Sequence, residues 1–291
     1  MATITSTPRL AGTVAHYDWQ WRGQPLRITY EALGGGEPVL MLPAFSTVSS
    51  RSELTRLAQQ LAAHYQVTVL DWPGFGDSDR LRLDYQPALY QQFLRDFVRD
   101  RFAAPIAVVA AGHAAGYVLA MPAAWSKVML VAPTWRGPLA VMGAPQSVRQ
   151  GVRELVRSHL LGPLLYWLNT RPAFLKWMYR RHVFVDATRL TPDYIAQRYR
   201  GAQQPGARYA PAAFVTGGLD PVQTQAEFLA YFKALTAPVM VIVAEQAPPS
   251  SQAEMEAMAT LPQVQSVRLP GTLGMAEEYG ERVAKVVLQF M

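Results

Sequence analysis

Short runs of consecutive apolar residues alternate along the chain with longer stretches in which apolar positions recur every three or four residues. A continuous apolar run is typical of a strand covered on both faces, and the longer spacing predicts amphipathic helices. The runs lie at 38–43, 67–70, 106–110, 128–131, 238–244 and 264–269, and the helical stretches at 52–65, 87–102, 222–235, 252–261 and 277–290, with a further helix from 115. Strands that alternate with helices predict an α/β fold with a mainly parallel, doubly wound sheet.

The first part of the chain follows a different pattern. Residues 12–32 alternate apolar and polar side chains on either side of Arg22-Gly23-Gln24. A period of two around a glycine turn predicts a pair of antiparallel strands.

The alternation of strands and helices stops at about Pro138 and resumes after Arg208. The segment between them is helical in pattern, punctuated by proline and glycine, and without a strand-like run. Its eleven Lys and Arg against three Asp and Glu give it a formal charge of +8, whereas the whole chain carries +6. We therefore predict a core domain formed by residues 1–137 and 209–291, and a helical insertion formed by residues 138–208, called the insertion below.

Composition narrows the class of protein. The 291 residues are 50% hydrophobic and 16% charged, as in a globular protein, and the absence of cysteine excludes disulfides and a cysteine nucleophile. No run approaches the ~20 apolar residues of a membrane span, and the first ten residues lack a signal-peptide pattern, so a cytoplasmic protein is expected. Metal-ligand spacing, a phosphate-binding loop and a nucleic-acid module are all missing, so we predict no metal, no cofactor and no nucleic-acid partner.

Three segments of the chain resemble the α/β-hydrolase superfamily. "PVLMLPAFSTVSS" matches the family's strand and oxyanion loop, and "VTVLDWPGFGDSDR" matches its strand and D-x-x-G-x-G-x-S loop. Gly112-His113-Ala114-Ala115-Gly116 stands where the family has its nucleophile elbow, G-x-S-x-G. The resemblance implies an α/β-hydrolase fold over nearly the whole chain, with the insertion as the family's helical cap.

The same resemblance indicates that the catalytic residues have been replaced. The family's triad comes in the order serine, acid, histidine, and the corresponding places here are Ala114, Ala247, and Gly274 or Ala276. His182 is the last histidine, so the final 109 residues contain no histidine that could serve as the family's base. An alanine methyl cannot attack a carbonyl, and we therefore expect no serine hydrolysis by the family mechanism.

Two functions remain open. The first is a non-catalytic protein that binds a small apolar ligand in the former substrate pocket. The alternative is an enzyme of the same fold that acts without the triad, by acid–base chemistry or positioning, through His113, Asp71, Ser46 and Tyr117. Each of these groups also has an ordinary structural use: His113 can pack beneath the strand, and Asp71 and Asp77 can hold their loop through backbone amides. The residues expected to line the pocket are Ala44, Phe45, Ser46, His113, Ala114 and Ala115.

The insertion offers a further possibility. Its helices mix aromatic and basic residues, among them Lys176, Trp177, Arg180 and Arg181. Such a surface can dock a protein partner or lie on an anionic membrane, and it can equally be a lid with solvated arginines. Residues 244–281 also resemble those of relatives from cyanobacteria and chloroplasts, which implies a photosynthetic setting.

Overall fold

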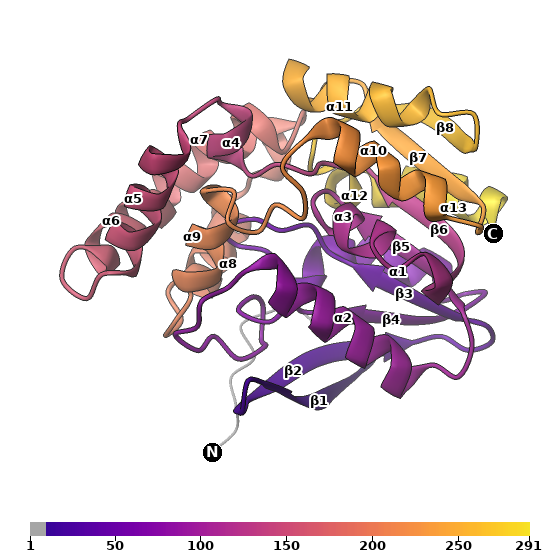
Figure 1. Ribbon diagram of the computed structural model, residues 1–291, viewed down its shortest axis with the longest axis horizontal. Helices are drawn as coiled ribbons and strands as arrows, with labels where there is room; N and C mark the ends of the chain where they lie inside the picture. Colours follow the sequence, from indigo (N-terminus) through magenta and orange to yellow (C-terminus); the bar gives the residue numbers. More distant parts are fainter. Residues whose placement is uncertain (1–9) are drawn as a thin grey trace.

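The computed structural model describes residues 10–291. The prediction that the first ten residues form no signal peptide therefore falls almost wholly outside the described part. Eight strands form one sheet in the order β1-β2-β4-β3-β5-β6-β7-β8 (Figure 1). The strands are β1 (Thr13–Trp21), β2 (Gln24–Leu33), β3 (Pro38–Leu42), β4 (Gln66–Leu70), β5 (Ile106–Ala111), β6 (Trp125–Val131), β7 (Val239–Ala244) and β8 (Val264–Leu269). Six neighbouring strands, β4, β3, β5, β6, β7 and β8, are parallel to one another, as the alternating pattern predicts.

The N-terminal pair is a hairpin. β1 pairs antiparallel with β2, with Thr13 opposite Ala32 and Trp21 opposite Gln24, and β2 pairs antiparallel with β4. Arg22 and Gly23 at the turn both have positive φ, the backbone of a tight two-residue hairpin. The predicted antiparallel pair is therefore present, and it extends the parallel sheet at one edge.

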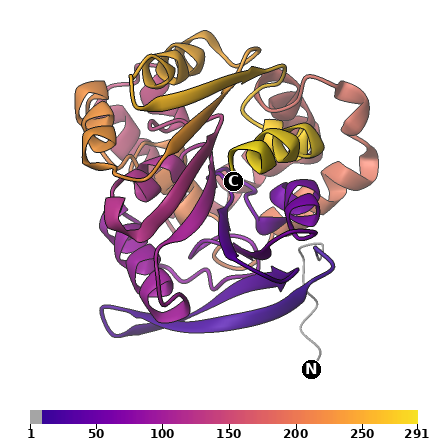
Figure 2. The same ribbon diagram turned by 90° about the vertical axis from the view of Figure 1, so that its right-hand side faces the viewer.

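Helices cover both faces of the sheet (Figure 2). Helix α2 shows how the sequence forms them: Pro87 opens it at the first helical position, and buried side chains such as Leu89, Phe93 and Phe97 follow at helical spacing. The helices of the core are α1 (Thr55–Leu61), α2 (Pro87–Arg101), α3 (Ala114–Leu119), α9 (Tyr209–Val215), α10 (Gln225–Ala234), α11 (Pro249–Ala259), α12 (Met275–Glu278) and α13 (Gly280–Phe290), with 3-10 turns η1 (Arg51–Leu54) and η2 (Pro122–Ala124).

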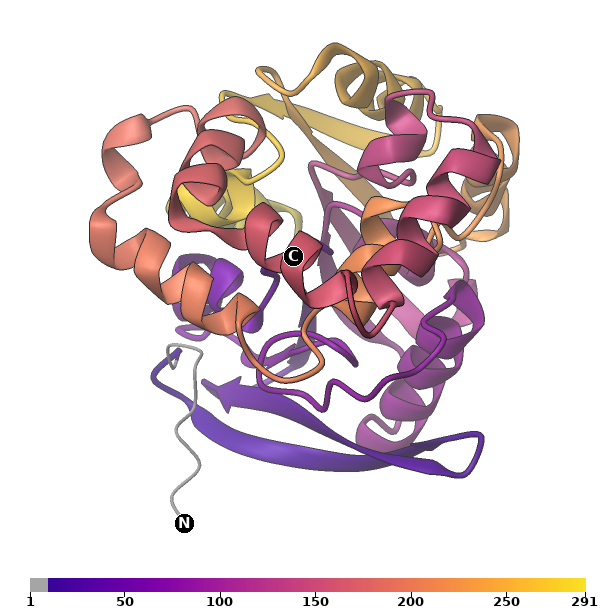
Figure 3. The same ribbon diagram turned by 90° about the vertical axis from the view of Figure 1, so that its left-hand side faces the viewer.

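The insertion lies on one side of the molecule, and Figure 3 views it from that side. It contains α4 (Pro138–Val141), α5 (Gln146–Arg157), α6 (Gly162–Thr170), α7 (Pro172–His182), η3 (Ala187–Arg189) and α8 (Pro192–Ala202). Leu175, Tyr179, Phe184, Leu190 and Ile195 form a small core of their own, separate from the main core of the sheet. α9, which follows, packs into the main core through Ala210, Ala213 and Phe214.

A buried arginine ties the hairpin to the loops at the carboxyl ends of the strands. The Arg51 side chain is fully buried and pairs with Glu31 from β2, at 3.2 Å, and with Asp71 and Asp77 from the loop after β4. Asp71 also accepts the backbone N–H of Arg51 at 2.6 Å and that of Asp77 at 2.9 Å. The prediction that Asp71 accepts backbone amides is thus correct, but its charged partner comes from a residue 20 positions earlier.

The glycines of this loop follow from the same contacts. Gly76 has φ +54, and a Cβ there would overlap the Asp71 carboxylate. Only glycine lets the backbone pass this close to a buried carboxylate in a left-handed conformation. The D-x-x-G-x-G spacing of the sequence is therefore a consequence of how the loop closes on Asp71.

We predict that Arg51→Met destabilises the fold strongly. Removing the cation leaves buried carboxylates without their counter-charge, a change that costs about 3–5 kcal/mol in the free energy of unfolding. Chemical denaturation followed by circular dichroism measures this loss. Arg99→Met is the control, because Arg99 pairs with Asp96 and Asp100 at the surface and its loss should change stability little. Similar midpoints for the two variants would contradict a structural role for the buried cluster.

Candidate functional site

The turn between β5 and α3 is the candidate site that the sequence singles out. Gly112 has φ +52, His113 has helical dihedral angles, and Ala114 is already the first residue of α3. Ala114 and Ala115 are fully buried. The left-handed residue of the turn is therefore Gly112, two positions before the alanine that the motif indicates.

Gly112 faces the loop that follows β3. A Cβ on Gly112 would lie 3.0 Å from the Cβ of Ala44. The backbone N–H groups of Phe45 and His113 have no hydrogen-bond partner among the described residues, whereas the N–H of Ala115 donates to the carbonyl of Gly112 at 3.2 Å. Unpaired amides from this loop and from the residue after the turn are the elements of an oxyanion hole. By backbone geometry, the residue between them is Gly112.

The His113 side chain forms its hydrogen bond with a residue far from the motif in the sequence. Its Nε2 lies 2.9 Å from the carbonyl oxygen of Leu219, which also accepts the Tyr117 hydroxyl at 2.7 Å. Because a carbonyl only accepts, this contact requires a proton on Nε2. Burial lowers the pKa of His113 to about 4, against the opposing effect of the Leu219 carbonyl. The ring is therefore neutral at physiological pH.

Asp220 is the acid nearest this histidine, a proximity that the sequence reasoning missed. Its Oδ1 lies 3.6 Å from Nε2 of His113 and accepts the backbone N–H of Gly137 at 2.7 Å. Burial raises the pKa of Asp220 to about 7, and the Gly137 N–H opposes that shift. Asp220 also fixes the start of the insertion, since Gly137 directly precedes α4.

The space above the turn is filled by aromatic rings. Phe45, only 3% exposed, is surrounded by rings whose centroids lie 4.9–6.3 Å from its own. They belong to Trp72, Phe75, Tyr90, His113, Tyr117 and Phe214. Phe45 therefore packs as a core residue here. Beside it, the partly exposed Ser46 accepts the backbone N–H of Val48 at 3.2 Å.

The turn after β7, where the family has its acid, contains Ala247. Its side chain is buried and its N–H donates to the carbonyl of Ala244 at 3.2 Å. The nearby Glu245 is exposed. No carboxylate in this turn points into the core.

The loop after β8, where the family has its base, holds the insertion in place. The N–H of Gly274 donates to the carbonyl of Val183 at 3.1 Å, and a Cβ on Gly274 would overlap Val183. Glu278 accepts the N–H groups of Val185 at 2.9 Å and Asp186 at 2.6 Å. The other predicted position, Ala276, is a buried residue of α12.

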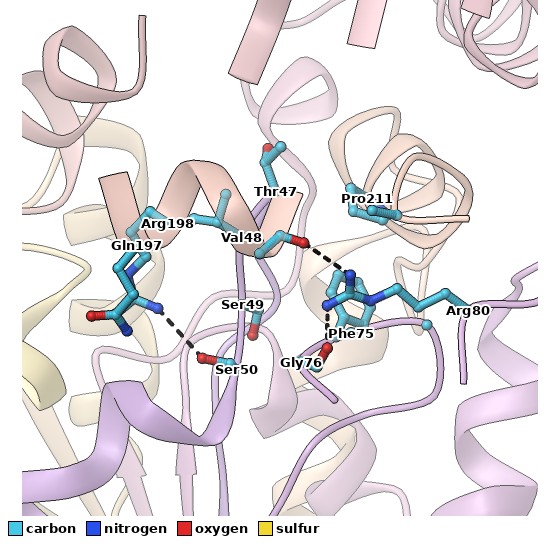
Figure 4. A pocket seen from close by; sticks show the side chains of 13 residues that line it. Thr47, Val48, Ser49, Ser50, Phe75, Gly76, Arg80, Gln197, Arg198 and Pro211 are labelled. Atoms are coloured by element: carbon cyan, nitrogen blue, oxygen red, sulfur yellow. Dashed lines mark hydrogen bonds between the residues drawn. The ribbon is translucent and has the colours of Figure 1, made fainter. Parts of the chain in front are cut away.

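A second buried arginine completes this attachment. Arg198 of α8 is only 4% exposed and pairs with Glu277, and its Nη1 lies 3.8 Å from Glu53. The same nitrogen contacts the hydroxyl of Ser50 at 3.4 Å (Figure 4). It also lies 3.4 Å from the hydroxyl of Ser52. Burial raises the pKa of Glu53 above its ordinary value, Arg198 counteracts the shift and Glu277 adds to it.

The cavity between the insertion and the core is small. It measures about 30 Å³ and is lined by the loops after β3 and β4 and by α8 (Figure 4). Arg80 closes one side by donating to the carbonyls of Gly76 and Gly201, the latter at 2.9 Å. Sites for small molecules usually measure ~300–1,000 Å³, so this cavity has room for little more than water. Of the residues expected to line a ligand pocket, none lies on it.

A larger groove lies at the other end of the parallel strands, where they begin. It measures about 620 Å³ and is lined at the amino ends of β3 to β6 by residues that include Tyr65, Phe102 and Lys127. Open α/β sheets bind ligands at the carboxyl ends of their strands, and this groove contains none of the predicted site residues. In the part of the chain that the structure describes, no three His, Asp or Glu side chains gather where they could hold a metal ion.

The four predicted surface residues of the insertion are exposed. Lys176, Trp177, Arg180 and Arg181 all lie on α7, whose other face is buried through Leu175 and Tyr179. Between residues 10 and 291 no helix is long and apolar enough to cross a membrane.

This strand order, the sharp turn after β5 and the helices inserted after β6 define the class of α/β-hydrolase-fold proteins. The chain belongs to the alpha/beta hydrolase family, whose family model matches residues 39–286. No curated protein sequence matches the chain.

Solved structures with the same fold include enzymes of several kinds. An esterase from Thermogutta terrifontis is 19% identical with a TM-score of 0.70, covering 96% of this chain and 97% of its own. The Cif epoxide hydrolase from Acinetobacter nosocomialis is 16% identical with a TM-score of 0.76, covering 99% and 91%. A bromoperoxidase from Bacillus anthracis is 15% identical with a TM-score of 0.70, covering 95% and 99%. At these identities the likeness establishes the fold alone.

We predict that His113 makes stability depend on pH. Its pKa is lower in the folded protein than its ordinary 6.5, so the unfolded chain takes up a proton first as the pH falls. The contribution of His113 to stability is then full above pH 6.5 and falls by about 3 kcal/mol between pH 6.5 and 4. Denaturation at a series of pH values should show this loss as a change in the difference between the wild type and His113→Asn, because Asp220, whose pKa burial raises to about 7, titrates in both proteins. The exposed His64→Asn is the control and should keep the wild-type slope. Parallel curves for wild type and His113→Asn would refute the assignment.

Proposed function

We propose that this chain is a non-catalytic member of the alpha/beta hydrolase family that acts by docking rather than by cleaving bonds. One observation carries the proposal: the turn after β5 presents no nucleophile. The motif indicates Ala114 and the backbone geometry favours Gly112, and neither residue has a hydroxyl, thiol or carboxylate. Without such a group, no covalent intermediate can form at this turn.

The other two positions of the triad support the same proposal. Ala247 stands at the acid's place, and the loop at the base's place is occupied by its contacts with Val183 and Val185. A histidine at position 274 would overlap Val183 unless the insertion moved. A fold stripped of its triad retains at most ~10³–10⁴-fold catalysis over water.

The alternative, an enzyme that uses the same pocket without the triad, rests on His113, Asp71, Ser46 and Tyr117. One observation favours it: Nδ1 of His113 is buried without a hydrogen-bond partner. However, rings enclose this imidazole, and burial lowers its pKa to about 4, so it is a weak base. The Asp71 carboxylate forms an ion pair with Arg51, and the Tyr117 hydroxyl donates its hydrogen bond to the carbonyl of Leu219.

Binding of a small apolar ligand has less support than docking. A cavity of about 30 Å³ cannot hold one, and the aromatic rings around Phe45 already fill the space above the turn. A ligand would have to displace those rings or open the ion pair between Arg198 and Glu277. The photosynthetic setting implied by the C-terminal resemblance stays a prediction.

We expect the protein to be catalytically silent. Purified protein should hydrolyse p-nitrophenyl acetate no faster than the same protein denatured by heat at equal concentration, and fluorophosphonate probes should leave its mass unchanged. The reason is the absence of a nucleophile at residues 112 and 114. A stoichiometric phosphonate adduct, located by peptide mass spectrometry, would overturn the proposal.

Restoring a hydroxyl alone should not restore hydrolysis. Ala114→Ser and Gly112→Ser should each stay at the blank rate, because no histidine is available to remove the serine's proton. Gly112→Ser should also lower the melting temperature, since φ is +52 there and its Cβ would press on Ala44. Turnover at ordinary esterase rates by either variant would show that a base is present after all.

A further inference from the structure

The exposed apolar side chains of this protein are concentrated in one place. Within residues 10–291, all eleven large hydrophobic side chains that are exposed lie between Met142 and Val185, inside the insertion. Leu160 is 90% exposed and Trp177 56%. Scattered exposed apolar residues need no explanation, but a concentration of this kind marks an interaction site.

Helices α6 and α7 and the turn before them carry most of this surface. The members of this docking surface are Leu160, Leu161, Leu164, Trp167, Leu168, Phe174 and Trp177. The rings of Phe174 and Trp177 lie 5.6 Å apart, and the two helices are neighbours. On α7 the opposite face is fixed to the insertion's core by Leu175 and Tyr179, so the exposed rings belong to a helix that is firmly packed.

The charges beside the docking surface are all positive. Arg171, Lys176, Arg180 and Arg181 are exposed, and α6 and α7 contain no Asp or Glu. Arg171 lies over the ring of Trp167, with its Cζ 4.6 Å from the ring centroid.

Much of the insertion's remaining positive charge is engaged elsewhere. Arg153 and Arg157 pair with Asp84, Arg189 with Asp186, and Arg198 with Glu277. Among the insertion's basic residues that form no ion pair, Arg171, Lys176, Arg180 and Arg181 therefore stand beside its exposed apolar side chains.

We propose that α6 and α7 bind the surface of an anionic membrane. Short helices with Trp, Phe and Leu on the exposed face and Arg and Lys beside them lie in the plane of the interface, with rings at headgroup depth. Long arginine side chains reach back from that depth to lipid phosphates. This goes beyond catalytic silence and does not depend on it, because no docking-surface residue touches the turn after β5.

The charge pattern favours a membrane over a protein partner. Interfaces between proteins deplete lysine at their centre, whereas here Lys176 stands between Phe174 and Trp177 along α7. Positive charges around an apolar surface are complementary to a membrane surface of anionic lipids.

The test is vesicle flotation of the full chain. We expect recovery with phosphatidylglycerol-containing vesicles at 0.1 M salt, little with pure phosphatidylcholine, and release at 1 M salt, where the Debye length falls from ~10 Å to ~3 Å. The triple variant Lys176→Gln, Arg180→Gln and Arg181→Gln should bind at least about tenfold more weakly. Its matched control removes the same charge from the core helices α2, α10 and α13, as Arg95→Gln, Lys233→Gln and Lys285→Gln, and should bind like the wild type.

A second readout locates the contact. Brominated acyl chains quench tryptophans that enter the lipid, and the quenching should be lost in the double variant Trp167→Phe and Trp177→Phe while flotation is largely kept. No flotation with any vesicle, equal recovery with neutral and anionic vesicles, an equal loss in the control triple, or persistent quenching in the double variant would each overturn the proposal. Esterase and probe-labelling assays report on catalytic silence separately, so the two proposals can fail independently.

Discussion

Arg51 is a cation buried among carboxylates, and the carboxyl-end loops of the sheet are arranged around it. It joins the hairpin through Glu31, the loop after β4 through Asp71 and Asp77, and its own backbone through Asp71. A buried charge without such partners would strongly destabilise the fold, so the segments that supply the carboxylates must pack around Arg51 together. The loops fixed in this way frame the turn after β5, which gives the candidate site its shape.

Arg198 plays the corresponding part for the insertion. In the α/β-hydrolase elbow, catalysis relies on a strained turn that exposes a nucleophile to a pocket beneath a cap. Here Glu277 and Glu278 of α12, directly after the loop that follows β8, hold the insertion, and aromatic rings pack around Phe45 beside the turn after β5.

The polar groups near the turn after β5 are engaged within the protein: His113 and Tyr117 share the carbonyl of Leu219, and Asp71 pairs with Arg51. The exposed apolar side chains lie elsewhere, in the insertion, and on α7 they stand beside exposed Lys176, Arg180 and Arg181. The proposed docking surface is therefore distant in the chain from the residues that the family uses for catalysis.

The sequence by itself determined the strands and their parallel order, because buried strands leave continuous apolar runs and the covering helices leave a regular spacing. It also placed Ala114 and Ala247 at motif positions of the family and His182 as the last histidine, and the proposal of a non-catalytic protein starts from these residues. Only the tertiary structure decided that Gly112 holds the left-handed position, that Asp220 lies beside His113, and that Arg51 and Arg198 meet their carboxylates. The contacts of Arg51, Arg198 and Asp220 join residues between 20 and 145 positions apart, and such pairings depend on how the elements pack in space, which no local pattern records.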